Sequence, residues 1–328
     1  MSTLPDWLQP TWEHLRQMIQ QDRLPHALLI SGPEGLGKHL LADRLTAYLL
    51  CEQPGATALA CGECNACNWL RSGAHPDLVQ MRPEEAGKAI KIDQVRKLGT
   101  DLEMTSHSGR YKIAVIQPAE AMNVNAANSL LKTLEEPTAN TLLVLLTATP
   151  EQLPATIRSR CQQIRMGCPS TVVAKTWLVQ QHIEAGVATR CLAMSSGAPL
   201  KALALAGSDS LAQRDSCLAD LIVIYNGQQD PLPVAEKWAQ DATNQRQIMQ
   251  WWQQWINSLI RWQQAGIADQ EAEIAQKLRQ IVDKVDCQRL FVFSDQLAGA
   301  LSGLTSGLNR QLLLEDLLID WAGLLLKR

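Results

Sequence analysis

The sequence lacks any apolar run that approaches the roughly 20 residues of a membrane-spanning helix. Its first residues, MSTLPDWLQPTWEHL, also lack the basic head and apolar stretch of a signal peptide. We therefore expect a cytoplasmic protein with no membrane partner.

An excess of charge of one sign is missing as well. The 30 Lys and Arg residues face 33 Asp and Glu residues, and the formal net charge is −3. A protein that binds nucleic acid over a broad surface of its own is basic. Any contact with DNA must therefore come from a local patch or through partners. Internal repeats and low-complexity tails are absent too.

The sequence does contain enough apolar residues for two or three domains, since 46% of its 328 residues are hydrophobic. In the first half, apolar runs bounded by turn residues alternate with helix-like stretches. The predicted strands are 27–30, 77–81, 112–116 and 141–147. This alternation predicts an α/β domain with a mainly parallel sheet, followed after about Arg165 by helices. We place domain boundaries near residues 165 and 207.

The stretch LLISGPEGLGKHLL has the pattern of a phosphate-binding loop. Gly32, Gly37 and Lys38 fit G-x-x-x-x-G-K between a predicted strand and a predicted helix, which is the context that the motif requires. Backbone N–H groups of such a loop hold phosphates, and the lysine reaches the terminal ones. His39 replaces the usual Ser or Thr, and imidazole is a poor ligand for Mg²⁺. The pattern favours a nucleotide-binding ancestor over a simple glycine turn, and it leaves open whether nucleotide still binds.

A second position distinguishes an ATPase from a silent relative. An ATPase of this type carries acidic residues at the end of strand 112–116, where they hold the metal and activate water. Gln117 and Pro118 occupy those places, and proline cannot act as a base. Glu120 lies farther on, and we interpret it as a solvated residue at a helix start. The missing hydroxyl at position 39 and the missing acidic residues at the strand end thus both predict a chain that does not hydrolyse ATP.

Four cysteines form a compact group in the sequence. Cys51, Cys61, Cys64 and Cys67 have the spacing C-x9-C-x2-C-x2-C. Four thiolates can enclose one tetrahedral ion, which is typical of structural zinc, and disulfides are rare in the cytoplasm. An iron–sulfur cluster is the alternative, although the usual following Cys-Pro is absent. His75 could replace one cysteine or serve as a hydrogen-bonded structural residue. We expect the remaining cysteines to be small buried residues: Cys161, Cys168, Cys191, Cys217 and Cys287.

Four segments together resemble the clamp-loader branch of the AAA+ family. They are RLPHALLISGPEGLGK, the cysteine group, NAANSLLKTLEEP and LPATIRSRCQQIR, and the match weakens through the helical remainder, with GLNRQLLLEDLL as a late similarity. The resemblance implies an AAA+ P-loop domain over 1–165 with a zinc module at 51–67, a helical lid domain over 166–207, and a C-terminal helical collar over 208–328 that joins subunits into a ring.

The resemblance also implies that some subunits of the ring hydrolyse ATP and others do not. Members that hydrolyse ATP carry a loop Thr, an acidic pair at the strand end and a lid arginine. The matching positions here are His39, Gln117 with Pro118, and Leu200. This implies a non-hydrolysing subunit of a DNA-directed DNA polymerase holoenzyme, with no catalysis of its own, that helps load a sliding clamp onto primed DNA. The implied partners are ATP-hydrolysing loader subunits, a clamp-opening subunit, the clamp and primed DNA. Thr147 matches a nucleotide-sensing position, or it is a structural Thr that ends a strand.

Arg160 matches the arginine that the family places at a subunit boundary, in the triplet Ser-Arg-Cys. Its planar guanidinium can bridge the γ-phosphate held by a neighbouring subunit. Arginine fingers supplied in trans contribute rate factors of about 10³ to 10⁵ in other nucleotide hydrolases. The resemblance therefore implies a catalytic role in trans, which Arg158 could share. The alternative is a solvated arginine beside a short strand.

Two further patterns concern surfaces. Glu135 and Glu136 precede Pro137 at a predicted helix end, where the helix dipole disfavours negative charge, and such local conflicts are expected at functional sites. We infer that this pair, with Lys132, belongs to an intersubunit surface, the alternative being a solvated helix end. A stripe of apolar residues at spacings of 3, 4 and 3 predicts helical core packing: Trp252, Trp255, Leu259 and Trp262. Which stripe serves the collar stays open.

Two other functions fit part of the sequence. One is an active P-loop ATPase motor, and His39, Gln117 and Pro118 argue against it. The other is a zinc-containing nucleic-acid-binding module. The net negative charge and the lack of interleaved aromatic and basic residues argue against that module. Turnover by the purified chain would favour the first, and DNA binding by the monomer would favour the second.

Overall fold

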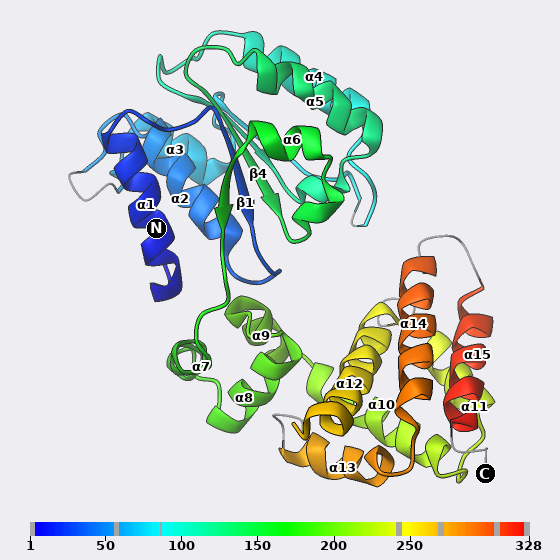
Figure 1. Cartoon of the computed structure of the whole chain (residues 1–328). Coiled ribbons are helices and arrows are strands. Elements are labelled where there is room, and N and C mark those ends of the chain that lie inside the picture. The colour runs from blue at the N-terminus through cyan, green and yellow to red at the C-terminus, as the bar shows by residue number, and fades with distance from the viewer. Residues whose placement is uncertain are drawn as a thin grey trace. The chain divides into compact units, whose positions relative to one another are not determined.

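The computed structural model describes residues 4–55, 59–85, 87–240, 245–267, 272–304 and 309–324. The chain divides into two compact units. Figure 1 colours the chain from blue at the N-terminus to red at the C-terminus. The first unit comprises Met1–Ala174 and Gly197–Lys201, and the second comprises Lys175–Ser196 and Ala202–Arg328. The division into three domains near residues 165 and 207 stays a prediction.

A five-stranded parallel sheet lies at the centre of the first unit. Its strands are β1 (Ala27–Ser31), β2 (Leu78–Met81), β3 (Lys112–Ile116), β4 (Thr141–Thr147) and β5 (Gln162–Arg165). Their order across the sheet is β2-β3-β4-β1-β5, and every neighbouring pair is parallel. The four strands that the sequence predicts are therefore confirmed, and so is the parallel sheet.

The fifth strand, β5, is not among the four strands predicted from apolar runs, although the alternative interpretation of Arg160 places a short strand beside it. Of its residues Gln-Gln-Ile-Arg, only Ile164 is buried. A strand with one apolar side chain gives neither an apolar run nor an alternating pattern, so periodicity cannot detect it. Its backbone nevertheless pairs with β1 from Leu28 to Ser31, which places β1 between β4 and β5.

Helices cover both faces of this sheet. On one side lie α1 (Gln9–Gln20), α2 (Lys38–Leu50) and α3 (Asn65–Ser72), and on the other side lie α4 (Ile92–Glu103), α5 (Val124–Glu135) and α6 (Ala155–Arg160) (Figure 1). Short 3-10 turns occur at Asp6–Leu8 (η1), Ala119–Ala121 (η2) and Pro150–Gln152 (η3).

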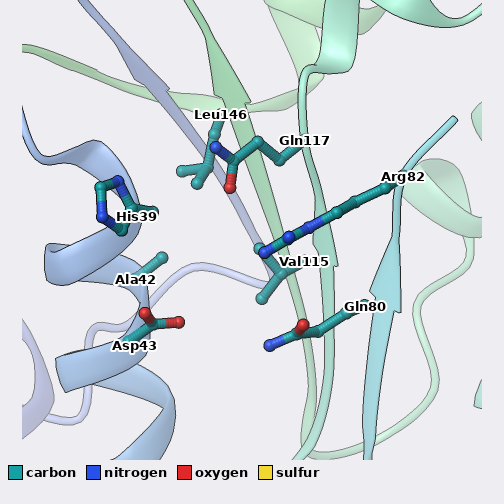
Figure 2. A pocket seen from close by; sticks show the side chains of 8 residues that line it. All are labelled: His39, Ala42, Asp43, Gln80, Arg82, Val115, Gln117 and Leu146. Carbon is teal, nitrogen blue, oxygen red and sulfur yellow. The ribbon is translucent and has the colours of Figure 1, made fainter. Parts of the chain in front are cut away.

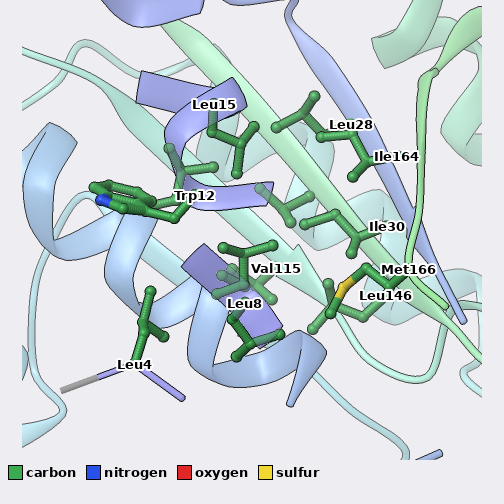
Figure 3. Close-up of a cluster of buried hydrophobic side chains, with 14 of the residues drawn as sticks. Leu4, Leu8, Trp12, Leu15, Leu28, Ile30, Val115, Leu146, Ile164 and Met166 are labelled. Carbon is green, nitrogen blue, oxygen red and sulfur yellow. The ribbon is translucent and has the colours of Figure 1, made fainter. Parts of the chain in front are cut away.

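Each face has its own apolar core. Leu28 and Ile30 of β1 pack in one cluster with Trp12 of α1 (Figure 3), whereas Leu29 packs in the other cluster with Leu130 of α5. Successive strand residues point to opposite faces, so a sheet covered on both sides needs apolar residues at every position. This explains why the central strands read as continuous apolar runs.

The described part of the second unit is helical. Its helices are α8 (Ala185–Met194), α10 (Ser210–Tyr225), α11 (Pro231–Ala239), α12 (Gln245–Ala265), α13 (Ala272–Val282), α14 (Cys287–Gly303) and α15 (Arg310–Gly323), while α7 (Thr171–Gln180) and α9 (Pro199–Ala206) contribute residues to both units. The predicted change from α/β to helices is thus confirmed for the described residues. None of the described helices is both long and apolar enough to cross a membrane.

The tryptophan stripe packs inside this second unit. Trp252, Trp255 and Leu259 of α12 are buried, and Trp262 is half-buried. The ring of Trp252 lies 5.7 Å from that of Trp321 in α15, in an edge-on arrangement. Core packing is therefore confirmed for the first three residues of the stripe.

Candidate functional site

Loop 32–37, which joins β1 to α2, needs its glycines for steric reasons. Gly35 and Gly37 have φ of 82° and 90°, a region that glycine adopts readily and other residues rarely. A Cβ added to Gly32 would lie 2.4 Å from the carbonyl oxygen of Met166, and one added to Gly35 would lie 2.4 Å from Cβ of Lys201. Close backbone approach therefore accounts for this part of the predicted loop pattern.

Lys38, the first residue of α2, turns its ammonium group back onto the loop. Its Nζ donates to the carbonyl oxygens of Gly32 at 2.5 Å and Pro33 at 2.9 Å. Burial lowers the pKa of Lys38, and the nearby carboxylates of Glu120 and Glu34 oppose that shift. A phosphate bound by this lysine would have to replace hydrogen bonds that the loop already supplies.

Residues from outside the loop cover it. The N–H of Leu200 donates to the carbonyl of Gly35 at 3.0 Å, and the indole N–H of Trp7 donates to the carbonyl of Leu36 at 2.9 Å. A Cβ at Gly37 would lie 3.2 Å from Cδ1 of Leu200. Leu200, which stands where the family implies a lid arginine, is thus an apolar neighbour of the loop.

A small polar pocket lies beside α2 at the carboxyl ends of the central strands (Figure 2). It is lined by His39, Ala42, Asp43, Gln80, Arg82, Val115, Gln117 and Leu146. His39 and Gln117, which replace the hydroxyl and the acid of an ATPase, therefore line the same pocket. Burial raises the pKa of Asp43, and the charges of His39 and Arg82 oppose that shift. The polar side chains of the pocket are thus one imidazole, two amides, one guanidinium and one carboxylate.

Glu120 is not the solvated residue that we expected, and that interpretation is wrong. Its Oε1 accepts the N–H of Ala148 at 2.9 Å, and its Oε2 is buried without a hydrogen-bond partner among the described residues. Its charge also acts on Lys38. The partner follows β4, which is distant in sequence, so the local pattern around Glu120 could not indicate this contact.

Thr147 ends β4 and is 1% exposed. Its Oγ1 accepts the N–H of Thr149 at 3.1 Å, and its carbonyl accepts the N–H of Gly32 at 3.3 Å. These contacts join the end of β4 to the phosphate loop and give Thr147 a structural use. Nucleotide sensing by this residue stays a prediction.

The four cysteines of the predicted metal site come together. Their sulfur atoms all lie within 4.8 Å of one another, with 4.0 Å between Cys51 and Cys64 and 3.9 Å between Cys61 and Cys67. For Zn–S bonds of about 2.3 Å, a regular tetrahedron has S–S edges of about 3.8 Å. The cluster therefore has the size of a zinc cage and could hold a metal ion.

Backbone N–H donors favour the charged form of one of these thiols, Cys61, whereas burial raises the pKa of Cys51 and raises that of Cys67 to about 12. The N–H groups of Cys61, Cys64 and Cys67 donate to the sulfurs of Cys51, Cys61 and Cys64 at 3.2, 3.4 and 3.5 Å. Backbone N–H groups of Glu63 and Cys64 lower the pKa of Cys61 to about 6. Metal binding requires thiolates, so the donors to Cys61 favour it, and the two buried thiols must lose their protons to the ion on binding.

His75 does not belong to this group of four ligand atoms. Its Nδ1 accepts the N–H of Asp77 at 3.0 Å, and its ring packs edge-on against Trp69 with 5.7 Å between ring centres. Burial lowers the pKa of His75, which favours the neutral ring. The structural interpretation of His75 is supported.

The five other cysteines behave in two ways. Cys161, Cys191 and Cys217 are buried, as expected. The expectation is wrong for Cys168, which is exposed, and for Cys287, which is half-buried at the first position of α14. A cysteine at a helix start or in a loop can be small and apolar without lying in a core.

Arg160 lies at the end of α6 and faces the end of α5. Its Nη2 lies 2.6 Å from Oε1 of Glu135, and its Nη1 donates to the carbonyl of Thr156 at 3.1 Å. The two charged side chains are 37% and 50% exposed, so both are accessible to solvent. Nε of Arg158, by contrast, is buried without a hydrogen-bond partner among the described residues. Arg158 as a whole is half-buried and Arg160 is the more exposed of the two; its role in trans stays a prediction.

Comparison with known proteins identifies relatives along the whole chain. Two family models match: "DNA polymerase III, delta subunit" over residues 7–169 and "DNA polymerase III, delta subunit, C terminal" over residues 208–323. The DNA polymerase III subunit delta' of Pseudomonas aeruginosa is 36% identical over 332 residues and 99% of each chain. The Escherichia coli subunit delta' is 31% identical over 95% of this chain and 93% of that one. The E. coli subunit tau is 36% identical over 144 residues, or 44% of this chain and 22% of that one.

Proposed function

The chain belongs to the family of DNA polymerase III delta-prime subunits, and from this premise we propose that it is a clamp-loader subunit that does not hydrolyse ATP. The observation that carries the second part is the pocket beside α2. There His39 and Gln117, in place of a hydroxyl and an acid, line one cavity with Arg82. A Mg²⁺ ion prefers oxygen ligands in octahedral geometry, and this set of side chains is unsuited to it.

The phosphate loop supports the same proposal. Lys38 donates to the carbonyls of its own loop, and Leu200 packs where a lid arginine would approach a nucleotide. Each contact would have to change before ATP could be held in the manner of an active ATPase. We infer that the loop keeps the shape of a nucleotide site as a structural connection between β1 and α2.

The proposed role is that of a scaffold within a ring of subunits. Its partners are ATP-hydrolysing loader subunits and a clamp-opening subunit, and together they load the sliding clamp onto primed DNA in the cytoplasm. In this role Arg160 acts in trans on ATP bound by a neighbouring subunit. The accessibility of its guanidinium at the surface supports this. Zinc, held by Cys51, Cys61, Cys64 and Cys67, stabilises the module between α2 and α3.

Reconstitution tests the proposal as a whole. The purified chain should show no ATP hydrolysis above background, and a loader assembled without it should fail to load clamps onto primed DNA. Adding the chain should restore both loading and the ATPase that DNA and clamp stimulate. A loader that works equally well without the chain would contradict the proposed function.

Restoring the missing hydroxyl alone should not create an ATPase. The substitution His39→Thr supplies the usual hydroxyl ligand for Mg²⁺, but the acidic pair is still missing at Gln117 and Pro118, so the site has neither a carboxylate ligand nor a base there. We expect phosphate release by the isolated variant to equal that of the wild-type chain. ATP hydrolysis by the His39→Thr variant would show that the missing acidic residues at the end of β3 do not prevent hydrolysis.

A further inference from the structure

We propose that Glu135 is a positioning residue for Arg160. The proposal deepens the function proposed above, since it presumes that Arg160 acts on a neighbour's ATP. The carboxylate of Glu135 lies 2.6 Å from Nη2 of Arg160, while the carbonyl of Thr156 accepts from Nη1 at 3.1 Å. The guanidinium therefore has an acceptor at each of its two terminal nitrogens.

Both acceptors belong to rigid parts of the first unit. Leu134, next to Glu135, is 2% exposed, and Ile157, next to Thr156, is fully buried in the same core cluster. The carbonyl of Leu134 also lies 3.0 Å from Nε2 of His26, a contact that fixes the end of α5. The packing of α5 against α6 thus sets where the guanidinium lies.

The location of Glu135 is unfavourable for a helix but suitable for this purpose. It is the last residue of α5, where the helix dipole disfavours a carboxylate. The ion pair itself is half-exposed, so solvent screens it and it stabilises the fold only slightly. A carboxylate that opposes its helix dipole and stabilises little is better explained by orienting Arg160 than by stability.

The arrangement leaves part of the guanidinium available. An arginine side chain has five N–H donors in a rigid plane, and Glu135 and Thr156 use one on each terminal nitrogen. The remaining three N–H groups can meet phosphate oxygens. Orientation before the reaction lowers the barrier, because a flexible side chain would otherwise lose its freedom in the transition state.

The experiment measures the stimulated kcat for ATP hydrolysis by the reconstituted loader. The Arg160-dependent rate is the kcat of the wild-type loader minus the kcat of the loader with Arg160→Ala. Glu135→Gln keeps the size of the side chain and removes its charge. We expect it to lower that Arg160-dependent rate about 10-fold, less than the roughly 100-fold that a 1 Å misplacement can cost. KM for ATP should not change, and Glu135→Gln combined with Arg160→Ala should be no slower than Arg160→Ala alone.

Glu103→Gln is the matched control, because Glu103 also ends a helix and forms an exposed ion pair, at 3.7 Å from Lys132, but does not contact Arg160. It should keep the wild-type rate. A Glu135→Gln loader as fast as wild type, or faster, would overturn the positioning role, and so would an equal loss in Glu103→Gln, which would indicate a general effect of surface charge. If Arg160→Ala itself had no effect, the proposed function in trans would fail instead.

Discussion

A loader assembled with the Arg160→Ala variant of this chain is expected to lose the ATPase activity of the one site that faces it. An arginine finger contributes a factor of about 10³ to 10⁵ in other nucleotide hydrolases, so the remaining rate at that site is negligible. The total stimulated rate should therefore fall by the share of that site and not to zero. The measurement is the clamp- and DNA-stimulated phosphate release of the reconstituted complex.

The structure predicts that this variant still folds and assembles. The Arg160 side chain is 37% exposed, and its ion pair with Glu135 is a solvent-screened contact of the kind that contributes about 0–1 kcal/mol. Zinc content and the melting temperature should therefore match those of the wild-type chain. Arg160→Lys should restore little activity, since lysine keeps the charge but lacks the planar fork.

Two results would contradict this assignment in different ways. Wild-type ATPase and clamp loading by the Arg160→Ala loader would remove Arg160 from catalysis. A variant that fails to enter the complex would show that Arg160 stabilises an interface. Arg158→Ala is a useful comparison, because Nε of Arg158 is buried whereas Arg160 is accessible.

The sheet could be predicted where its strands are covered on both faces. β3 and β4 are buried along their whole length, and their inner residues, IAVI and LLVLL, appear in the sequence as unbroken apolar runs. β5 lies at the sheet edge with a single buried side chain, Ile164, and its place depends on pairing with β1. Such pairing is a contact between segments that are distant in sequence, so the local pattern of apolar residues cannot predict it.

The candidate sites divide in the same way. The cysteine cluster could be predicted because its four ligands lie within 17 residues, so spacing alone brings the sulfurs together. The conflict of Glu135 with its helix dipole was visible in the sequence, but its partner was not. That partner, Arg160, is 25 residues away, and only the packing of α5 against α6 brings the two side chains together. The hydrogen bond that the N–H of Ala148 donates to Glu120 was missed for the same reason.

Replacing Cys64 with serine should release the metal and destabilise the first unit. Cys64 is the N-cap of α3, and its sulfur accepts the N–H of Cys67 at 3.5 Å. Serine is itself a good N-cap and can accept the same bond, so the cap survives the substitution. Any loss of stability must then come from the missing thiolate. We expect about one zinc per wild-type chain and far less in the variant, measured by elemental analysis.

The size of the effect follows from what the metal holds. Zinc supplies about 10–16 kcal/mol in peptides whose whole fold depends on it. Here neither apolar core of the sheet includes the four cysteines, so we expect the ion to hold mainly the segment from Cys51 to α3, and a loss of about 2–3 kcal/mol would lower the melting temperature by about 5–10 °C. A chelator should lower the melting temperature of the wild-type chain equally and leave Cys64→Ser unchanged. Cys287→Ser, at a half-buried cysteine outside the cluster, is the control and should keep both zinc and stability. Iron with visible absorbance, or a reduced wild-type chain without metal, would contradict the zinc site.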